Sequence, residues 1–218
     1  MKTKSKALLL ALCAVLLVAA SVLGTLAYLT SQDQVTNTFA VGSVAITLDE
    51  KDVDNDSNTE DNVTVEGVIR DKANGYNLLP GHQYDKDPII RVDSKSEDCY
   101  LFVIVKNEIA AIESDAEGDK TVAVQMAEKG WNKVGTTENG ILYVYGAVTD
   151  PTAVSADADI TVFETFKIDG DVNNTTLLGY EGKTIVVTAY AVQKDGFEDK
   201  TATYIWTTAL NDPALAQG

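Results

Sequence analysis

Both alternating faces are apolar in the stretch Cys99-Tyr100-Leu101-Phe102-Val103-Ile104-Val105. Successive side chains of a strand point to opposite faces of its sheet, so a strand of this composition must be covered on both sides. The segment Ile185 to Val192 is nearly as apolar. We therefore predict two central strands around which the rest of the fold is built.

Most other apolar runs of the chain alternate between an apolar and a polar face, and clusters of Gly, Asn, Asp or Pro separate them. The predicted strands are Val35 to Leu48, Val63 to Arg70, Ile89 to Asp93, Cys99 to Asn107, Ile141 to Val148, Ile160 to Ile168 and Thr184 to Gln193. Helical spacing is restricted to Glu198 to Leu210 and to the ambiguous segment Lys120 to Lys129, for which we favour a helix. The pattern predicts a mainly β fold, an antiparallel two-sheet β-sandwich of the jelly-roll kind with one or two short helices.

The N-terminus has the three-part layout of a secretory signal. Lysines stand at positions 2, 4 and 6, an apolar run follows from Ala7 to Ala20, and small residues precede Tyr28. This layout predicts a signal peptide over residues 1–27, with cleavage between Ala27 and Tyr28. The alternative is an uncleaved anchor, because the 21 residues from Ala7 to Ala27 are long enough to span a bilayer. After cleavage, residues 28–218 are predicted to form a single domain that is not attached to the membrane.

Charge and composition exclude several classes of function. With Lys+Arg 17 against Asp+Glu 33, the formal net charge is -16, which repels nucleic acid. His82 is the only histidine, so neither a two-histidine zinc motif nor a convincing Ser-His-Asp triad is available. Cys99 would be the only thiol of the mature chain, and we interpret it as a small buried hydrophobe. The sequence predicts no catalytic residue, and hence a protein that is not an enzyme.

One acidic segment, residues 49–62, has the alternating carboxylates that can wrap around calcium. They are Asp52, Asp54 and Asp56. The segment departs from the EF-hand loop, since Ser57 stands where glycine is needed and Val63 where the bidentate glutamate belongs. A solvated acidic loop without a metal is the alternative, and no other cofactor is predicted.

Two N-terminal stretches together resemble a known family. Gly24-Thr25-Leu26-Ala27-Tyr28-Leu29-Thr30-Ser31 is followed by Val35-Thr36-Asn37-Thr38-Phe39-Ala40-Val41-Gly42-Ser43-Val44. This arrangement is similar to the export signature of the TasA/camelysin family, whose leaders are cut by a SipW-type signal peptidase. The resemblance covers about 45 residues.

The resemblance implies a jelly-roll protein secreted by a Gram-positive bacterium into the cell surface or biofilm matrix. It also implies fibres, formed when the N-terminal segment of one subunit completes the sheet of another copy or of a related matrix subunit. The donor would lie in residues 28–48, with Phe39, Val41, Val44 and Ile46 as its apolar side chains. The competing expectation is a secreted surface module that binds calcium or a glycan and forms no fibres.

Overall fold

The computed structural model describes residues 12–17, 43–54 and 63–210. The chain divides into two compact units, Met1–Val41 and Gly42–Gly218. In the first unit, residues 12–17 are helical and their side chains are exposed. None of the helices in the described ranges is long and apolar enough to cross a bilayer. The predicted cleavage site at Ala27 and Tyr28, the donor residues Phe39 and Val41, and Asp56 lie outside the described residues.

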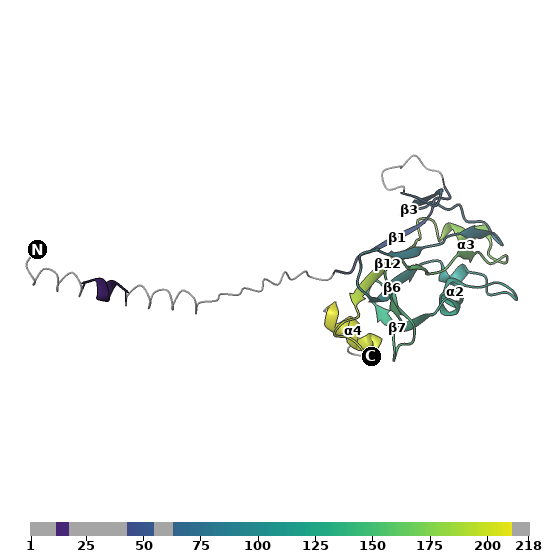
Figure 1. Ribbon diagram of the computed structural model, residues 1–218. Helices are drawn as coiled ribbons and strands as arrows, with labels where there is room; N and C mark the ends of the chain where they lie inside the picture. Colours follow the sequence, from purple (N-terminus) through teal and green to yellow (C-terminus); the bar gives the residue numbers. More distant parts are fainter. Residues whose placement is uncertain (1–11, 18–42, 55–62, 211–218) are drawn as a thin grey trace, which may run out of the picture. The chain divides into compact units, whose positions relative to one another are not determined.

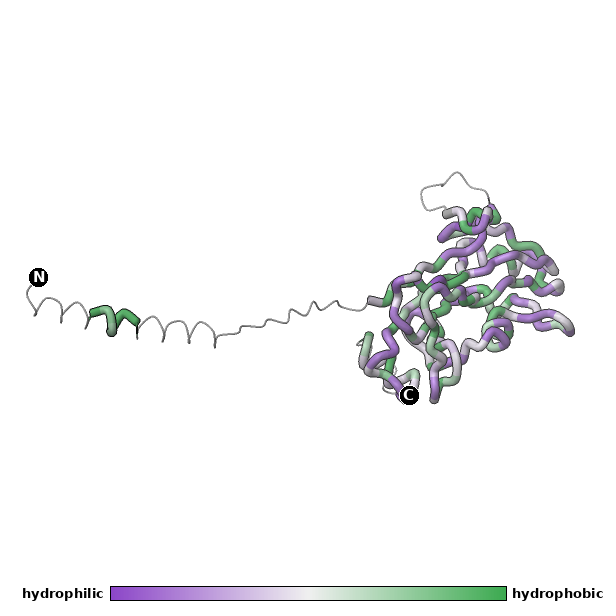
Figure 2. The backbone as a smooth tube through the Cα atoms, in the orientation of Figure 1, coloured by the Kyte–Doolittle hydropathy of each residue, from purple (hydrophilic) through white to green (hydrophobic). Residues whose placement is uncertain are grey.

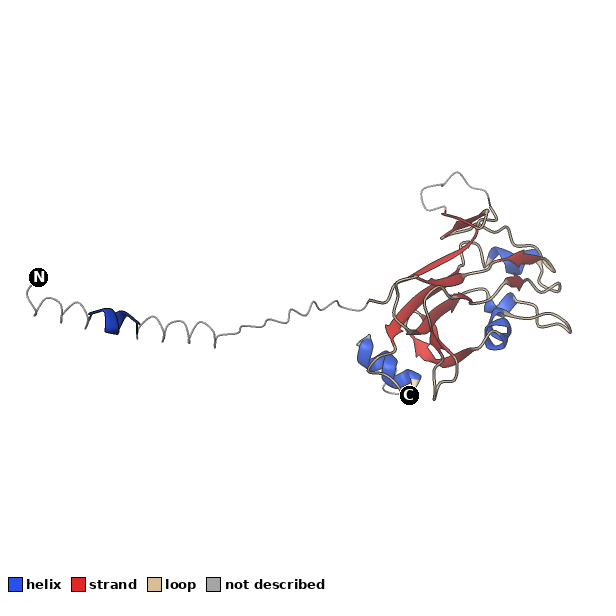
Figure 3. Ribbon diagram, viewed as in Figure 1, coloured by secondary structure: helices blue, strands red, loops and turns tan. Residues whose placement is uncertain are grey.

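The second unit is built on two five-stranded antiparallel sheets (Figures 1 and 3). The first sheet has the order β10 (Asp159–Thr161), β5 (Ile89–Val92), β1 (Ile46–Lys51), β3 (Val68–Asp71), β2 (Val63–Val65). The second has the order β12 (Ile185–Gln193), β6 (Cys99–Asn107), β8 (Gly140–Tyr145), β7 (Trp131–Thr137), and β9 (Ala153–Val154) also pairs with β6. A two-stranded ribbon joins β4 (Gln83–Asp85) to β11 (Thr165–Lys167). The described helices of this unit are short: η1 (Ala110–Ile112), α2 (Val122–Glu128), α3 (Asn174–Leu178) and α4 (Ala202–Ala209).

Strand β6 is central, as its sequence predicts. Leu101, Val103 and Val105 pack in one core cluster with Ile90 and Val92 of the first sheet. Phe102 and Ile104 point the other way, into a second cluster that includes Ile205 and Trp206 of α4. Both faces of β6 are apolar because a sheet covers one and a helix covers the other. Figure 2 colours the hydrophobic stretches of this unit green. The prediction of a mainly β, antiparallel fold with few helices is confirmed.

The prediction of a second central strand is wrong: β12 lies at an edge of its sheet and pairs only with β6. Ile185, Val187 and Ala189 pack against the core shared by the two sheets. On the opposite face, α4 covers only the C-terminal part of the strand, where Tyr190 meets Trp206 with ring centroids 5.0 Å apart. Val186, on the uncovered part, is 45% exposed. Strand β12 therefore has the composition of an interior strand but an open edge.

Other differences between prediction and structure come from turns that interrupt an apolar run. The predicted strand Val63 to Arg70 is a hairpin of β2 and β3, because Glu66 and Gly67 adopt positive φ angles of 50° and 83°. The predicted strand Ile160 to Ile168 is divided into β10 and β11, which pair with different strands. The two predicted helices are present as α2 and α4, whereas β4, β7 and α3 were not predicted.

Candidate functional site

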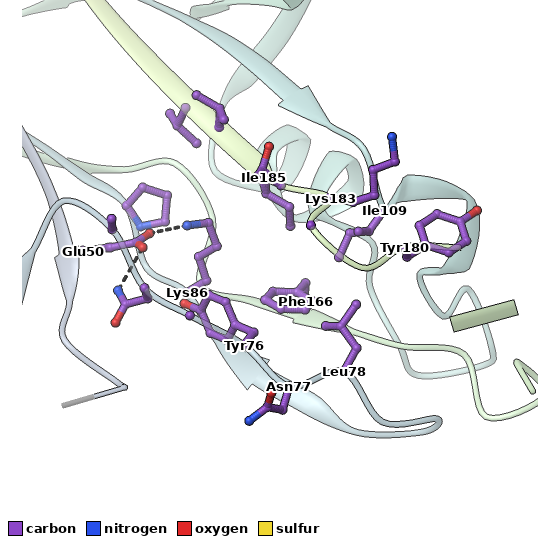
Figure 4. Close-up of a pocket in the computed structure, with 18 of the residues that line it drawn as sticks. Glu50, Tyr76, Asn77, Leu78, Lys86, Ile109, Phe166, Tyr180, Lys183 and Ile185 are labelled. Atoms are coloured by element: carbon purple, nitrogen blue, oxygen red, sulfur yellow. Dashed lines mark hydrogen bonds and ion pairs between the residues drawn. The ribbon is translucent and has the colours of Figure 1, made fainter. Parts of the chain in front are cut away.

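A groove of about 1050 Å³ opens between β1, the loop of residues 71–78, α3 and the start of β12 (Figure 4). Its walls are largely apolar and come from segments far apart in the sequence. The apolar lining residues are Leu48, Ala73, Tyr76, Leu78, Pro88, Ile109, Phe166, Leu177, Leu178, Tyr180, Ile185, Val186 and Val187. Leu178 is 72% exposed, so apolar surface continues from the groove onto α3. The groove is therefore a candidate binding site.

The free edge of β12 borders this groove. The N–H groups of Glu108 and Lys194 donate to the carbonyls of Thr184 and Asp98, at 3.0 and 2.8 Å. Hydrogen bonding alternates along an antiparallel pair, so even-numbered residues of β12 direct their N–H and C=O groups toward β6. The odd-numbered residues, including Ile185 and Val187, direct theirs away from β6. Among the described residues, no strand pairs with that edge.

Strand β1, on the opposite wall, is also partly open. The N–H of Asp93 donates to the carbonyl of Ala45 at 2.9 Å, and the pairing continues through Thr47 and Asp49. By the same alternation, the backbone groups of Ile46 and Leu48 point away from β5. Strand β3 pairs with β1 only at Glu50 and Lys51, beyond these residues. Two strand edges thus offer backbone hydrogen-bonding groups around one apolar groove.

A charged pair interrupts the apolar wall. Lys86 donates a hydrogen bond of 2.5 Å to Oε2 of Glu50, and Asn74 donates one of 2.9 Å to Oε1 of the same carboxylate. The side chains of Lys86 and Glu50 are only 10% and 7% exposed. Burial, reinforced by the negative charge of Glu50, raises the pKa of Tyr76 far above its ordinary value, so its hydroxyl stays neutral. This pair is a buried polar feature that the groove presents (Figure 4).

Three carboxylates meet close to the groove. Oxygen atoms of Asp52, Asp54 and Asp71 lie within 4.8 Å of one another. Asp52 and Asp54 belong to the predicted acidic segment, while Asp71, at the end of β3, was not predicted because it is remote in sequence. Asp71 is 2% exposed, and its Oδ1 accepts hydrogen bonds from the backbone N–H groups of Lys72 and Ala73. The cluster has the oxygen ligands that calcium prefers.

The side chains of the remaining residues predicted from the sequence do not line the groove. Val44 and Ile46 pack against their own domain, and Ile46 is the first residue of β1, paired with Val92. His82 is exposed and contacts the ring of Tyr84 with centroids 4.8 Å apart. Cys99 is buried, and burial, assisted by Asp98, raises the pKa of its thiol to about 11, so the reactive thiolate is disfavoured.

The fold and the groove define a mainly β protein whose candidate site is an apolar groove between two incompletely paired strands. Comparisons with protein-family models, with curated proteins and with solved structures found no match.

Proposed function

We propose that this chain is a secreted, non-catalytic structural protein of a bacterial cell surface or biofilm matrix, whose subunits join by strand donation. Residues 28–41 of one copy enter the groove of the next copy and pair with the free edge of β12. The observation that carries this proposal is the open edge of β12, an apolar strand that lines an apolar groove. Val44 and Ile46 belong to the acceptor domain itself, so the donated part ends before Gly42.

Strand donation accounts for the composition of β12 in physical terms. An incoming strand would satisfy outward-pointing N–H and C=O groups and would cover the exposed side chain of Val186. Phe39 and Val41 of the donor lie two residues apart and so share one face of an extended strand. Burying two side chains of this size contributes about 1.5–3 kcal/mol each.

Removal of residues 28–41 from the mature chain is expected to leave soluble monomers. The deletion takes away the donor and leaves the groove intact. Filaments of the mature and the shortened chain would be quantified by electron microscopy and sedimentation at equal concentration.

A second variant of unchanged length tests whether assembly needs the apolar side chains of the donor and not only its length. Phe39→Ser combined with Val41→Ser keeps the length of the segment but removes the two apolar side chains nearest its C-terminal end, and is also expected to give monomers. Filaments of unchanged abundance after the deletion would reject strand donation.

The acidic cluster favours a second candidate function, a surface module that binds calcium. The supporting observation is that the buried Asp71 joins Asp52 and Asp54, although the sequence separates them widely. A cation there would offset the mutual repulsion of three carboxylates.

Isothermal titration calorimetry with calcium chloride tests this candidate. The mature chain is expected to give a binding heat that the double variant Asp52→Asn, Asp54→Asn lacks. The control variant Asp115→Asn, Glu117→Gln removes two negative charges from exposed positions outside the cluster and is expected to behave like the unaltered chain. Identical heats for all three proteins would remove the calcium candidate.

A further inference from the structure

The charged pair Lys86 and Glu50 imposes a chemical requirement on whatever fills the groove. An ammonium group has three N–H donors, and among the described residues Glu50 accepts one of them. The ring of Tyr76, with its centroid 5.9 Å from Nζ, supplies a cation–π contact but no conventional acceptor. Glu50 accepts one bond at each carboxylate oxygen, from Lys86 and from Asn74, and each oxygen has capacity for a second.

An apolar side chain laid over this pair would separate both charges from water without giving them new hydrogen bonds. A side chain with both an acceptor and a donor would instead bond to the ammonium and the carboxylate together. A carboxamide has both groups, whereas an aliphatic side chain has neither. A hydroxyl also has both functions but on a single atom, whereas a carboxamide presents them on two atoms that can reach both charges. The groove therefore favours a strand that is apolar on its inward face except for one such polar side chain, best supplied by an amide.

The N-terminal segment has this pattern. In an extended strand Val35, Asn37, Phe39 and Val41 share one face, since side chains alternate with a period of two. Within residues 35–41 that face is apolar except for the carboxamide of Asn37, and it becomes polar toward the N-terminus at Ser31 and Asp33. The opposite face carries Thr36, Thr38 and Ala40.

We propose that Asn37 of the donor bonds to the Lys86–Glu50 pair of the acceptor and thereby sets the register of the joint. This inference rests on the proposed strand donation and adds the contact that fixes which donor residue lies at which place in the groove. In this register Phe39 and Val41 enter the apolar part of the groove. A slip of one residue turns the threonine face inward, and a slip of two places an apolar side chain on the charged pair.

The test compares two polar-to-apolar substitutions on opposite faces of the donor, in the mature chain of residues 28–218. Asn37→Leu is expected to raise the critical concentration for filament formation at least about tenfold, because hydrogen bonds to charged groups are lost. Thr38→Val is the matched control on the other face, and its critical concentration is expected to stay within about twofold of the unaltered chain. Filaments would be quantified by sedimentation at several protein concentrations.

A second pair of variants tests the contact itself. Replacing both partners, Glu50→Met with Lys86→Met, keeps similar volumes and leaves no unpaired charge, so the domain is expected to remain folded. In this background the preference is expected to reverse, with Asn37→Leu assembling more readily than the chain that retains Asn37. Circular dichroism and thermal unfolding of the monomers would verify the fold.

The outcomes separate this inference from the function on which it rests. If the unaltered chain forms filaments, and Asn37→Leu and Thr38→Val have equal critical concentrations, the register contact is overturned while strand donation stands. If the unaltered chain forms no filaments under any condition that keeps it folded, strand donation itself fails. An elevated critical concentration for Asn37→Leu alone, reversed in the double-methionine background, supports the inference.

Discussion

Replacing Val187 by proline is expected to abolish filament formation while leaving the monomer folded. Val187 directs its N–H away from β6, so proline removes a hydrogen-bond donor from the free edge and none from the pairing of β12 with β6. Its ring also obstructs a strand that approaches this edge. Proline retains a hydrocarbon side chain of similar size on the side of the shared core.

The measurement is sedimentation and electron microscopy of the mature chain, with thermal unfolding as the check on the fold. Val187→Ala is the matched control, because it shortens the side chain but keeps the N–H donor. We expect the alanine variant to form filaments and the proline variant to form none. If a folded proline variant assembles as well as the alanine variant, the incoming strand does not pair with β12.

Replacing Arg70 by methionine is expected to lower the free energy of unfolding by about 3–5 kcal/mol, because it leaves carboxylates without their buried partner. The guanidinium bonds to the carboxylate of Asp49, to Oδ2 of Asp87 at 3.1 Å, and to the backbone carbonyls of both residues at 3.2 and 2.9 Å. The side chains of Arg70 and Asp49 are only 5% and 10% exposed. Burial alone lowers the pKa of Arg70, but its hydrogen bonds to Asp49 and Asp87 outweigh that effect and raise it.

Chemical denaturation of the monomeric chain, shortened by residues 28–41, measures this loss without interference from assembly. Lys120→Met is the control, since Lys120 and Glu128 form an ion pair with side chains 52% and 51% exposed. Exposed pairs of this kind contribute about 0–1 kcal/mol. Equal losses for the two variants would show that the contacts of Arg70 with Asp49 and Asp87 stabilise the domain no more than an exposed ion pair does.

Much of the fold was predictable from local patterns. Strand β6 has the predicted bounds, Cys99–Asn107, because no Gly, Pro, Asn or Asp interrupts the run between Asp98 and Asn107. Helix α4 was predictable from the spacing of Ala202, Ile205 and Trp206, all buried. The hairpin of β2 and β3 was not predicted, because the chain reversal depends on the positive φ of Glu66, which the sequence does not show.

The candidate site was predictable only in part. The carboxylates Asp52 and Asp54 were visible as neighbours in sequence, whereas Asp71 reaches them through the pairing of β1 with β3. The contact between Glu50 and Lys86 spans 36 positions and depends on how β1 lies beside the loop before β5. No local pattern contains such a contact.

The amino-acid sequence alone determined that the second unit is mainly β, because alternation of apolar and polar residues is a property of adjacent positions. It also determined that β12 is apolar on both faces. Which edge of β12 stays open was decided only by the tertiary structure, since strand order depends on which distant segments pair. Local pattern assigns this apolar strand to the interior of a sheet, but in the structure it lies at an edge and lines an apolar groove.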